Sequence, residues 1–158
     1  MRKYLYIFLI AIAPIIELRG AIPAGAAMHL QPIPTYIFAV LGNLLPVPII
    51  LFFVKPVLMY MKRFRIFRGL VEWLENKAMK HSEKMEKGAF FGLLLFVAIP
   101  LPGTGAWTGG LVAALLDIKK RYSFPAIILG VLCAGVIMTL VSYGVVGGLD
   151  FLLPKSAA

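Results

Sequence analysis

An acid and a base lie two residues apart inside an apolar stretch near the start of the chain. Glu17 and Arg19 have mostly apolar neighbours, and Pro14 and Pro23 stand on either side of them. A charge at membrane depth is costly unless it is paired or lines a wet cavity. A carboxyl in such a place can bind and release a proton, and a guanidinium can hold an anionic group. We therefore identify Glu17 as a candidate proton carrier and Arg19 as a candidate anion ligand. The alternative is a structural ion pair that locks the segment.

Proline is expected to interrupt the helix at both ends of this motif. It removes a hydrogen-bond donor and clashes with the preceding turn, so breaks are predicted at Pro14 and at Pro23. Farther along, Asn43 is the only amide deep in its own apolar stretch. It is predicted to line a cavity or to bond a carbonyl group that Pro46 leaves without a donor.

A second interrupted apolar stretch, from Pro100 to Gly110, carries no charge. Its candidate site residues are Pro100, Pro102, Gly103, Thr104, Gly105, Trp107 and Thr108. Hydroxyl groups, an indole and free backbone amides at the start of a short helix suit a phosphate or a carboxylate. The alternative is a helix-packing site, because Gly105 and Gly109 have the spacing of small residues at helix contacts.

The sequence shows no pattern typical of an enzyme or of a metal site. No nucleophile has a base at a catalytic spacing, and there is no phosphate-binding loop. His29 and His81 lack a nearby cysteine or acid at ligand spacing, and Cys133 is the only cysteine. The sequence predicts a protein that is not an enzyme and that holds neither a metal nor a cofactor.

The composition is that of a membrane protein. Hydrophobic residues make up 61% of the chain and the mean hydropathy is +0.91. Gly88–Leu116 and Tyr122–Leu149 contain no charged residue, and each is longer than the roughly 20 residues that cross a bilayer. We predict one multi-pass membrane domain over residues 1–158 in the inner (cell) membrane. The net charge of +9 does not indicate nucleic acid, because eight of the 16 basic residues lie between Lys62 and Lys87, and such clusters flank membrane spans.

The chain divides into two similar halves around that basic segment. Repeat 1 covers about 4–61 and repeat 2 about 88–153, and 62–87 has the apolar periodicity of an amphipathic helix on the membrane surface. A solvated connector helix is the alternative for this segment. Aligning the halves matches Pro14 with Pro100, and Gly42 with Gly130 after a two-residue insertion.

The repeat predicts an all-α integral membrane fold. Each half would consist of a Pro/Gly-broken re-entrant helical hairpin followed by a transmembrane helix. A hairpin that enters and leaves on one side makes no crossing, so the two repeats would be inverted. Opposed hairpins can satisfy each other's polar backbone groups near the midplane. Four full spans remain the alternative, since the charge distribution favours neither topology.

Two motifs resemble the paired signatures of the small multidrug export protein family. They are Pro14-Ile15-Ile16-Glu17-Leu18-Arg19-Gly20-Ala21-Ile22-Pro23 and Pro100-Leu101-Pro102-Gly103-Thr104-Gly105-Ala106-Trp107-Thr108-Gly109. The similarity covers nearly the whole chain, and it implies a distant relationship to the DedA superfamily of membrane proteins. The resemblance implies two opposed re-entrant hairpins, with Glu17 and Arg19 as acid and base of the site. DedA-like proteins are linked to lipid-carrier flipping, lipid scrambling and proton-dependent transport. The second motif differs from DedA patterns because it carries no charge.

These observations predict a transporter of a small amphipathic or anionic substrate. Glu17 would exchange protons and Arg19 would bind the substrate. Within transport, a drug/proton antiporter would depend more on Glu17, and a lipid or lipid-carrier flippase or scramblase more on Arg19. A non-transporting scaffold that acts through the basic amphipathic helix is a further alternative. Expected partners are membrane lipids, a small-molecule or lipid substrate and a second copy of the chain in a homodimer, with no nucleic acid.

Overall fold

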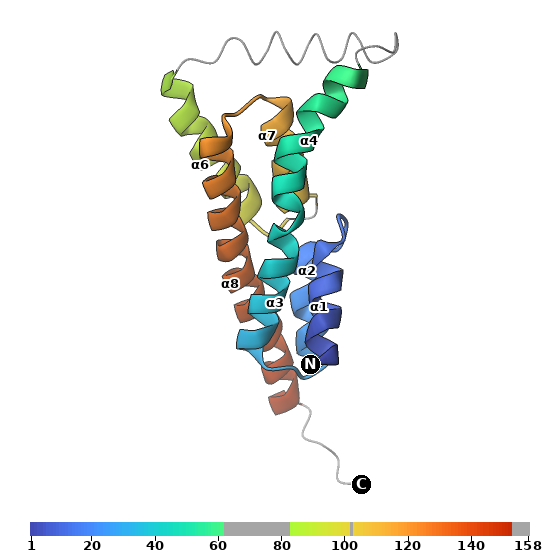
Figure 1. Ribbon diagram of the computed structural model, residues 1–158. Helices are drawn as coiled ribbons and strands as arrows, with labels where there is room; N and C mark the ends of the chain where they lie inside the picture. Colours follow the sequence, from blue (N-terminus) through green and yellow to red (C-terminus); the bar gives the residue numbers. More distant parts are fainter. Residues whose placement is uncertain (62–82, 102, 153–158) are drawn as a thin grey trace. The chain divides into compact units, whose positions relative to one another are not determined.

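Every regular element in the described part of the chain is a helix. The structure, a computed structural model, describes residues 1–61, 83–101 and 103–152 (Figure 1). The helices are α1 (Arg2–Ile12), α2 (Glu17–Ala27), α3 (Pro32–Leu44), α4 (Pro46–Met61), α6 (Glu83–Ala98), α7 (Ala106–Leu115) and α8 (Lys120–Leu152). The predicted all-helical fold is confirmed for these residues. Most of the predicted amphipathic connector lies outside them, as does Pro102.

The described helices differ in length. Pro32–Val54, with 23 residues, and Lys120–Gly147, with 28, are long and apolar enough to cross a membrane. By contrast, α1 and α2 have 11 residues each and α7 has 10. A helix of 11 residues rises about 16 Å, roughly half the hydrocarbon core of a bilayer. α1, α2 and α7 are thus too short to cross a bilayer alone, whereas α6 has 16 described residues.

The helices form two compact units. The first contains Met1–Asn43 together with the chain from Leu132, and the second contains Leu44–Val131. Unit 1 thus holds α1, α2, α3 and the C-terminal part of α8. Unit 2 holds α4, α6, α7 and the N-terminal part of α8. α8 thus contributes to both units.

Glycines let the helices of unit 1 approach closely. α1 and α2 lie side by side (Figure 1), and α3 packs against both. A Cβ atom at Gly25 in α2 would overlap the side chain of Thr35 in α3, and one at Gly42 in α3 would overlap the carbonyl oxygen of Phe8 and the side chain of Ala11 in α1. Only residues without a side chain permit such contacts.

Hydroxyl groups tie α3 to α8 within unit 1. The Tyr143 hydroxyl donates to Thr35 Oγ1 at 3.0 Å, and the Tyr36 hydroxyl donates to the carbonyl oxygen of Leu132 at 3.3 Å. Thr35 is fully buried and donates in turn to the Gln31 carbonyl oxygen at 2.8 Å. A buried hydroxyl is costly unless it is hydrogen-bonded, and this network meets that requirement.

The same kind of packing holds unit 2 together. α7 packs against both α4 and α6. A Cβ atom at Gly110 in α7 would lie 2.9 Å from the Ile50 side chain in α4, and one at Gly130 in α8 would lie 2.7 Å from Val97 in α6. Gly109 also meets Val97. The glycines of α7 and α8 are thus helix contacts in this unit.

The glycine contacts occur at equivalent positions in the two halves. Gly42 meets Phe8 and Ala11, whereas Gly130 meets Leu94 and Val97. The sequence offset is 88 residues for the glycines (130 − 42) and 86 for their partners (94 − 8 and 97 − 11). The difference of two residues falls in the link between the short helices. The two-residue insertion and the match of Gly42 with Gly130 are confirmed by these contacts.

The ends of α2 and α7 also repeat. Each helix is followed by a non-glycine residue in the left-handed region, His29 with φ 53° and Asp117 with φ 52°. The next N–H in each case donates to the carbonyl five residues back: Leu30 to Gly25 at 3.0 Å and Ile118 to Ala113 at 2.9 Å. This is the Schellman pattern of helix termination. The same corner therefore leads into α3 and into α8.

The structure differs from the sequence-based prediction at two prolines. Pro23 does not break the chain: it lies inside α2, where burial of residues on both sides of it offsets the lost hydrogen bond to the Arg19 carbonyl. The predicted span 33–61 contains one turn residue, Leu45, between α3 and α4, because Pro46 cannot donate to the carbonyl of Gly42.

Candidate functional site

The link between α1 and α2 begins at a proline. Ala13 has an extended backbone (φ −65°, ψ 132°), as expected for a residue that precedes proline, and Pro14 is exposed in the turn that follows. The Glu17 N–H then donates to the Ala13 carbonyl oxygen at 3.0 Å as α2 starts. The predicted break at Pro14 is confirmed. It puts Glu17 at the first position of the second short helix.

Glu17 combines burial with an unusual backbone conformation. Its side chain is only 4% exposed, and its φ is 52°. A non-glycine residue in this region costs on the order of 1–3 kcal/mol and persists only where its surroundings hold it. The equivalent position in the second half is Gly105 (105 − 17 = 88), whose φ of 151° is also positive. An acid thus occupies a place where the backbone favours glycine.

Arg19 lies in the first turn of α2, beside Glu17. Its side chain is half-buried, and its charge interacts with that of Glu17. In a regular helix, residues two apart point to different faces. The left-handed backbone of Glu17 removes that regularity at the helix start. The two charges thus interact at the start of α2, and their roles in a site stay a prediction.

Asn43 adds an amide at the same level of unit 1. It is fully buried, and neither its Oδ1 nor its Nδ2 atom has a hydrogen-bond partner among the described residues. Glu17 lies eight residues before Gly25 and Asn43 eight after Thr35 (25 − 17 = 43 − 35). Because α2 and α3 run antiparallel and meet at Gly25 and Thr35, both residues lie about 12 Å from that contact. The two elements thus bring Glu17, Arg19 and Asn43 to one level.

The second group of predicted residues lies in unit 2, around the link between α6 and α7. Gly103 and Gly105 have φ of 83° and 151° and allow the chain to turn. The Thr104 hydroxyl is 2.9 Å from the Ile99 carbonyl oxygen, and the Thr108 hydroxyl is 3.4 Å from that of Gly105. Both hydroxyls therefore hydrogen-bond to the backbone of their own hairpin.

The remaining residues of this group contribute less chemistry. Pro100 is half-buried in the link, and Trp107 is half-buried in the first turn of α7. Trp107 stands where Arg19 stands in the first half (107 − 19 = 88). Among the described residues, no cluster of three or more His, Cys, Asp and Glu side chains could hold a metal. Between Pro100 and Gly110 there is no charged side chain to match Glu17 and Arg19.

The polar contacts between α3 and α8 could not be predicted from the sequence. Thr35 and Tyr143 are separated by 108 residues, and neither belongs to a motif. Thr35 is only one of several small polar residues in apolar stretches. Tertiary packing alone identifies it as part of the buried polar interior of unit 1.

Replacing Asn43 by leucine is expected to stabilise the protein and impair its function. An unpartnered buried amide costs about 1–3 kcal/mol, so Asn43→Leu should raise the free energy of unfolding by at least about 1 kcal/mol. Denaturant titration in micelles measures this. The matched control is Thr35→Val, which removes a partnered hydroxyl and should destabilise. Equal losses in both variants would contradict a ligand-binding role for Asn43.

The fold and the buried charges define a class before any family is considered. Every regular element among the described residues is a helix, and two helices have the length and composition of membrane spans. The family model described as "Putative small multi-drug export protein" matches residues 17–137, more than half of the chain, and the chain belongs to this family. The match begins at Glu17 and includes the link between α6 and α7. Comparison with curated proteins and with solved structures gives no match.

Proposed function

We propose that the protein is a multi-pass membrane transporter of a small amphipathic or anionic substrate. Glu17 exchanges protons and Arg19 binds the substrate. The observation that carries the proposal is the buried carboxyl of Glu17, held in a left-handed backbone position beside Arg19. Strained residues cluster at functional sites. Membership of an export family agrees with this role.

Charge balance in a buried site would couple the proton to the substrate. An ionised carboxylate at membrane depth requires a compensating positive charge. Arg19 supplies it while the site is empty. When an anionic substrate binds Arg19, the carboxylate loses that compensation and Glu17 takes up a proton. Proton and anion then move together, and the transport of a monovalent anion is electroneutral.

The proposal includes two inverted repeats with re-entrant hairpins. The lengths of the helices support it: α1, α2 and α7 each rise about half the thickness of the hydrocarbon core. Four full spans would require each hairpin to contain a helix of about 20 residues. With one crossing in each half, the second repeat is inverted. Interrupted apolar segments at equivalent positions of two repeats are typical of transporter binding sites.

The role of Arg19 is tested by substituting it in liposomes. Purified protein is reconstituted under an imposed pH gradient, and proton flux is followed after adding anionic amphiphiles, anionic lipid carriers or cationic dyes in turn. We expect anionic amphiphiles to drive flux in the wild type, Arg19→Gln to abolish it, and Arg19→Lys to retain part of it because the charge remains.

Each alternative has its own outcome in this experiment. Flux driven by cationic dyes and retained in Arg19→Gln would replace the proposal with drug/proton antiport. Movement of lipid carriers that requires Arg19 but no proton gradient would indicate a flippase. Flux absent with every substrate, from protein shown to be folded, would overturn the transport proposal.

A further inference from the structure

The corner between α7 and α8 carries three consecutive bases that its local fold does not require. Lys119, Lys120 and Arg121, here called the basic corner, follow the Schellman turn at the end of α7. Their equivalents before and in α3 are Gln31, Pro32 and Ile33, at the same offset of 88 residues (119 − 31). That corner forms the same turn without a charge. The bases therefore serve something other than the turn.

The buried side of the corner confirms that the turn is independent of the bases. Ser123 is fully buried, and its hydroxyl lies 3.3 Å from the Lys119 carbonyl oxygen, four residues back. Thr35 makes the equivalent bond to Gln31. In both corners a buried hydroxyl thus holds the first turn of the long helix. By contrast, all three side chains of the basic corner are exposed.

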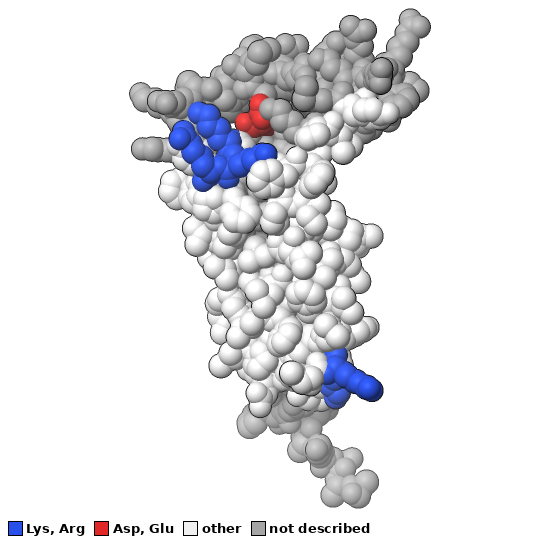
Figure 2. Space-filling view, in the orientation of Figure 1, with Lys and Arg blue, Asp and Glu red and all other residues white. Residues whose placement is uncertain are grey.

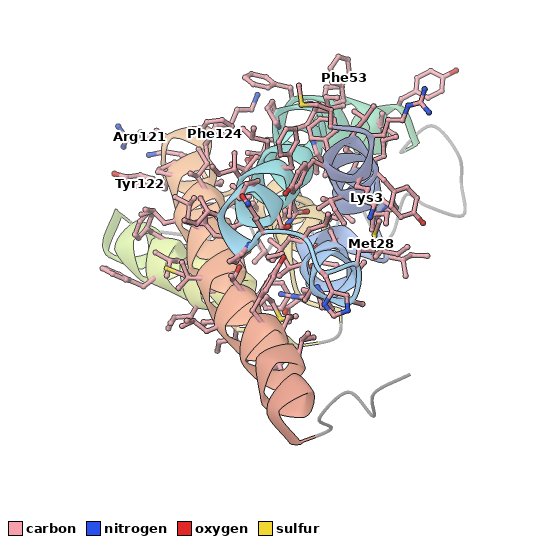
Figure 3. All side chains as sticks on the ribbon, turned by 90° about the horizontal axis from the view of Figure 1, so that it is seen from below. Lys3, Met28, Phe53, Arg121, Tyr122 and Phe124 are labelled. Atoms are coloured by element: carbon pink, nitrogen blue, oxygen red, sulfur yellow. The ribbon has the colours of Figure 1, made fainter. Side chains whose placement is uncertain are left out.

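The basic corner lies where an apolar span begins. The membrane-crossing stretch of α8 starts at Lys120, so these side chains belong at the level of the lipid headgroups. Lys120 Nζ lies 3.9 Å from the centre of the Phe52 ring, and Arg121 Cζ lies 4.8 Å from that of Tyr122. Figure 3 shows Arg121 and Tyr122 together at this end of α8. Aromatic rings and bases in one layer are typical of the membrane interface.

Both the charged side chains and the N-terminus of α8 favour an anion at the basic corner. The N-terminus of α8 presents backbone N–H groups and the positive end of the helix dipole. In Figure 2 basic side chains gather next to acidic atoms, while most of the described surface on that face is uncharged. Residues 117–121 hold three bases and one acid, Asp117, a net charge of +2. This surface favours a phosphate group.

We propose that the basic corner binds the headgroups of anionic phospholipids. The bases contact the lipid phosphate, and Phe52 and Tyr122 lie beside the glycerol region. A soluble phosphate compound has the same phosphate chemistry, but the start of an apolar span at Lys120 favours a ligand with acyl chains. The inference depends on α8 crossing the membrane and not on transport through Glu17 and Arg19, so each can fail without the other.

The test is a competition between two lipids on the purified protein. Phosphatidylglycerol and phosphatidylcholine are added together to protein in neutral detergent, and the retained lipids are counted by native mass spectrometry. The test variant, Lys119→Gln/Lys120→Gln/Arg121→Ile, copies two residues of the uncharged corner and is expected to fold. Because each base near an anionic surface contributes roughly fivefold in affinity, the preference for phosphatidylglycerol should fall on the order of 100-fold.

Two controls keep the test decisive. Arg2→Gln/Lys3→Gln removes two exposed bases at the start of α1 and should leave the preference unchanged. Lys119→Arg/Lys120→Arg/Arg121→Lys keeps the charge and should retain it. No preference in the wild type, or a full preference in the neutral variant, would overturn the inference and leave the bases a role in membrane topology alone. Displacement of the lipid by inorganic phosphate at equal concentration would also overturn it, in favour of a soluble anion.

Discussion

Substrate-driven proton flux is expected to fall to the level of protein-free liposomes when Glu17 is replaced by glutamine. The amide has nearly the shape of the acid, so the hairpin should remain folded, but it cannot bind and release a proton. Without that step, the charge of a bound anion is left uncompensated in a buried site. The proton flux is measured by the fluorescence of a pH-sensitive dye inside reconstituted liposomes.

Asp117→Asn is the matched control for this experiment. It makes the same change from carboxylate to amide at almost the same backbone angle, since φ is 52° at both Glu17 and Asp117. Asp117 is exposed beyond the end of α7, so its substitution should leave the flux unchanged. Full activity in Glu17→Gln would remove the acid from the mechanism and restore the view that it forms a structural ion pair with Arg19.

The largest effect on stability is expected from Gly42→Ala. The added methyl group would overlap the carbonyl oxygen of Phe8 and the side chain of Ala11. A backbone atom cannot move without shifting α1, so the free energy of unfolding should fall by about 2 kcal/mol. Detergent denaturation in micelles, followed by circular dichroism, gives this value. Because α1 leads directly to the link that contains Glu17, transport should fall as well.

The internal repeat supplies controls for this substitution. Gly130→Ala makes the equivalent change against Val97 and the Leu94 carbonyl oxygen and should also be destabilising. Gly92 in α6 has no atom within 4 Å of an added Cβ, so Gly92→Ala should be neutral or stabilise the helix by up to about 1 kcal/mol. Similar losses at Gly42 and Gly92 would show that helix flexibility, rather than close contact, determines the effect.

The two halves share a scaffold but differ in chemistry. Positions equivalent to Glu17 and Arg19 hold Gly105 and Trp107 in the second half. The second hairpin adopts a positive φ with glycine at no steric cost, whereas the first does so with a buried acid. One acid in one hairpin is sufficient for a single proton-binding step. In the second hairpin the Thr104 and Thr108 hydroxyls hydrogen-bond to the backbone of the same link.

The sequence by itself determined the local features of the fold. It predicted the all-helical class, the breaks near Pro14 and Pro100, and the match of Gly42 with Gly130. These were accessible because proline and glycine act on the backbone where they stand. It failed at Pro23 and Leu45, where the surrounding contacts decide whether a helix tolerates a proline. Glu17 and Arg19 could be singled out as candidates, since charges in an apolar stretch are rare, and their roles stay a prediction.

Only the tertiary structure decided how the candidate site is built. The left-handed backbone of Glu17 depends on the turn that precedes it. The burial of Asn43, without a hydrogen-bond partner among the described residues, depends on where α3 packs. The bond between Thr35 and Tyr143 joins residues 108 positions apart. Such contacts follow from the packing of whole helices, which local residue patterns do not encode.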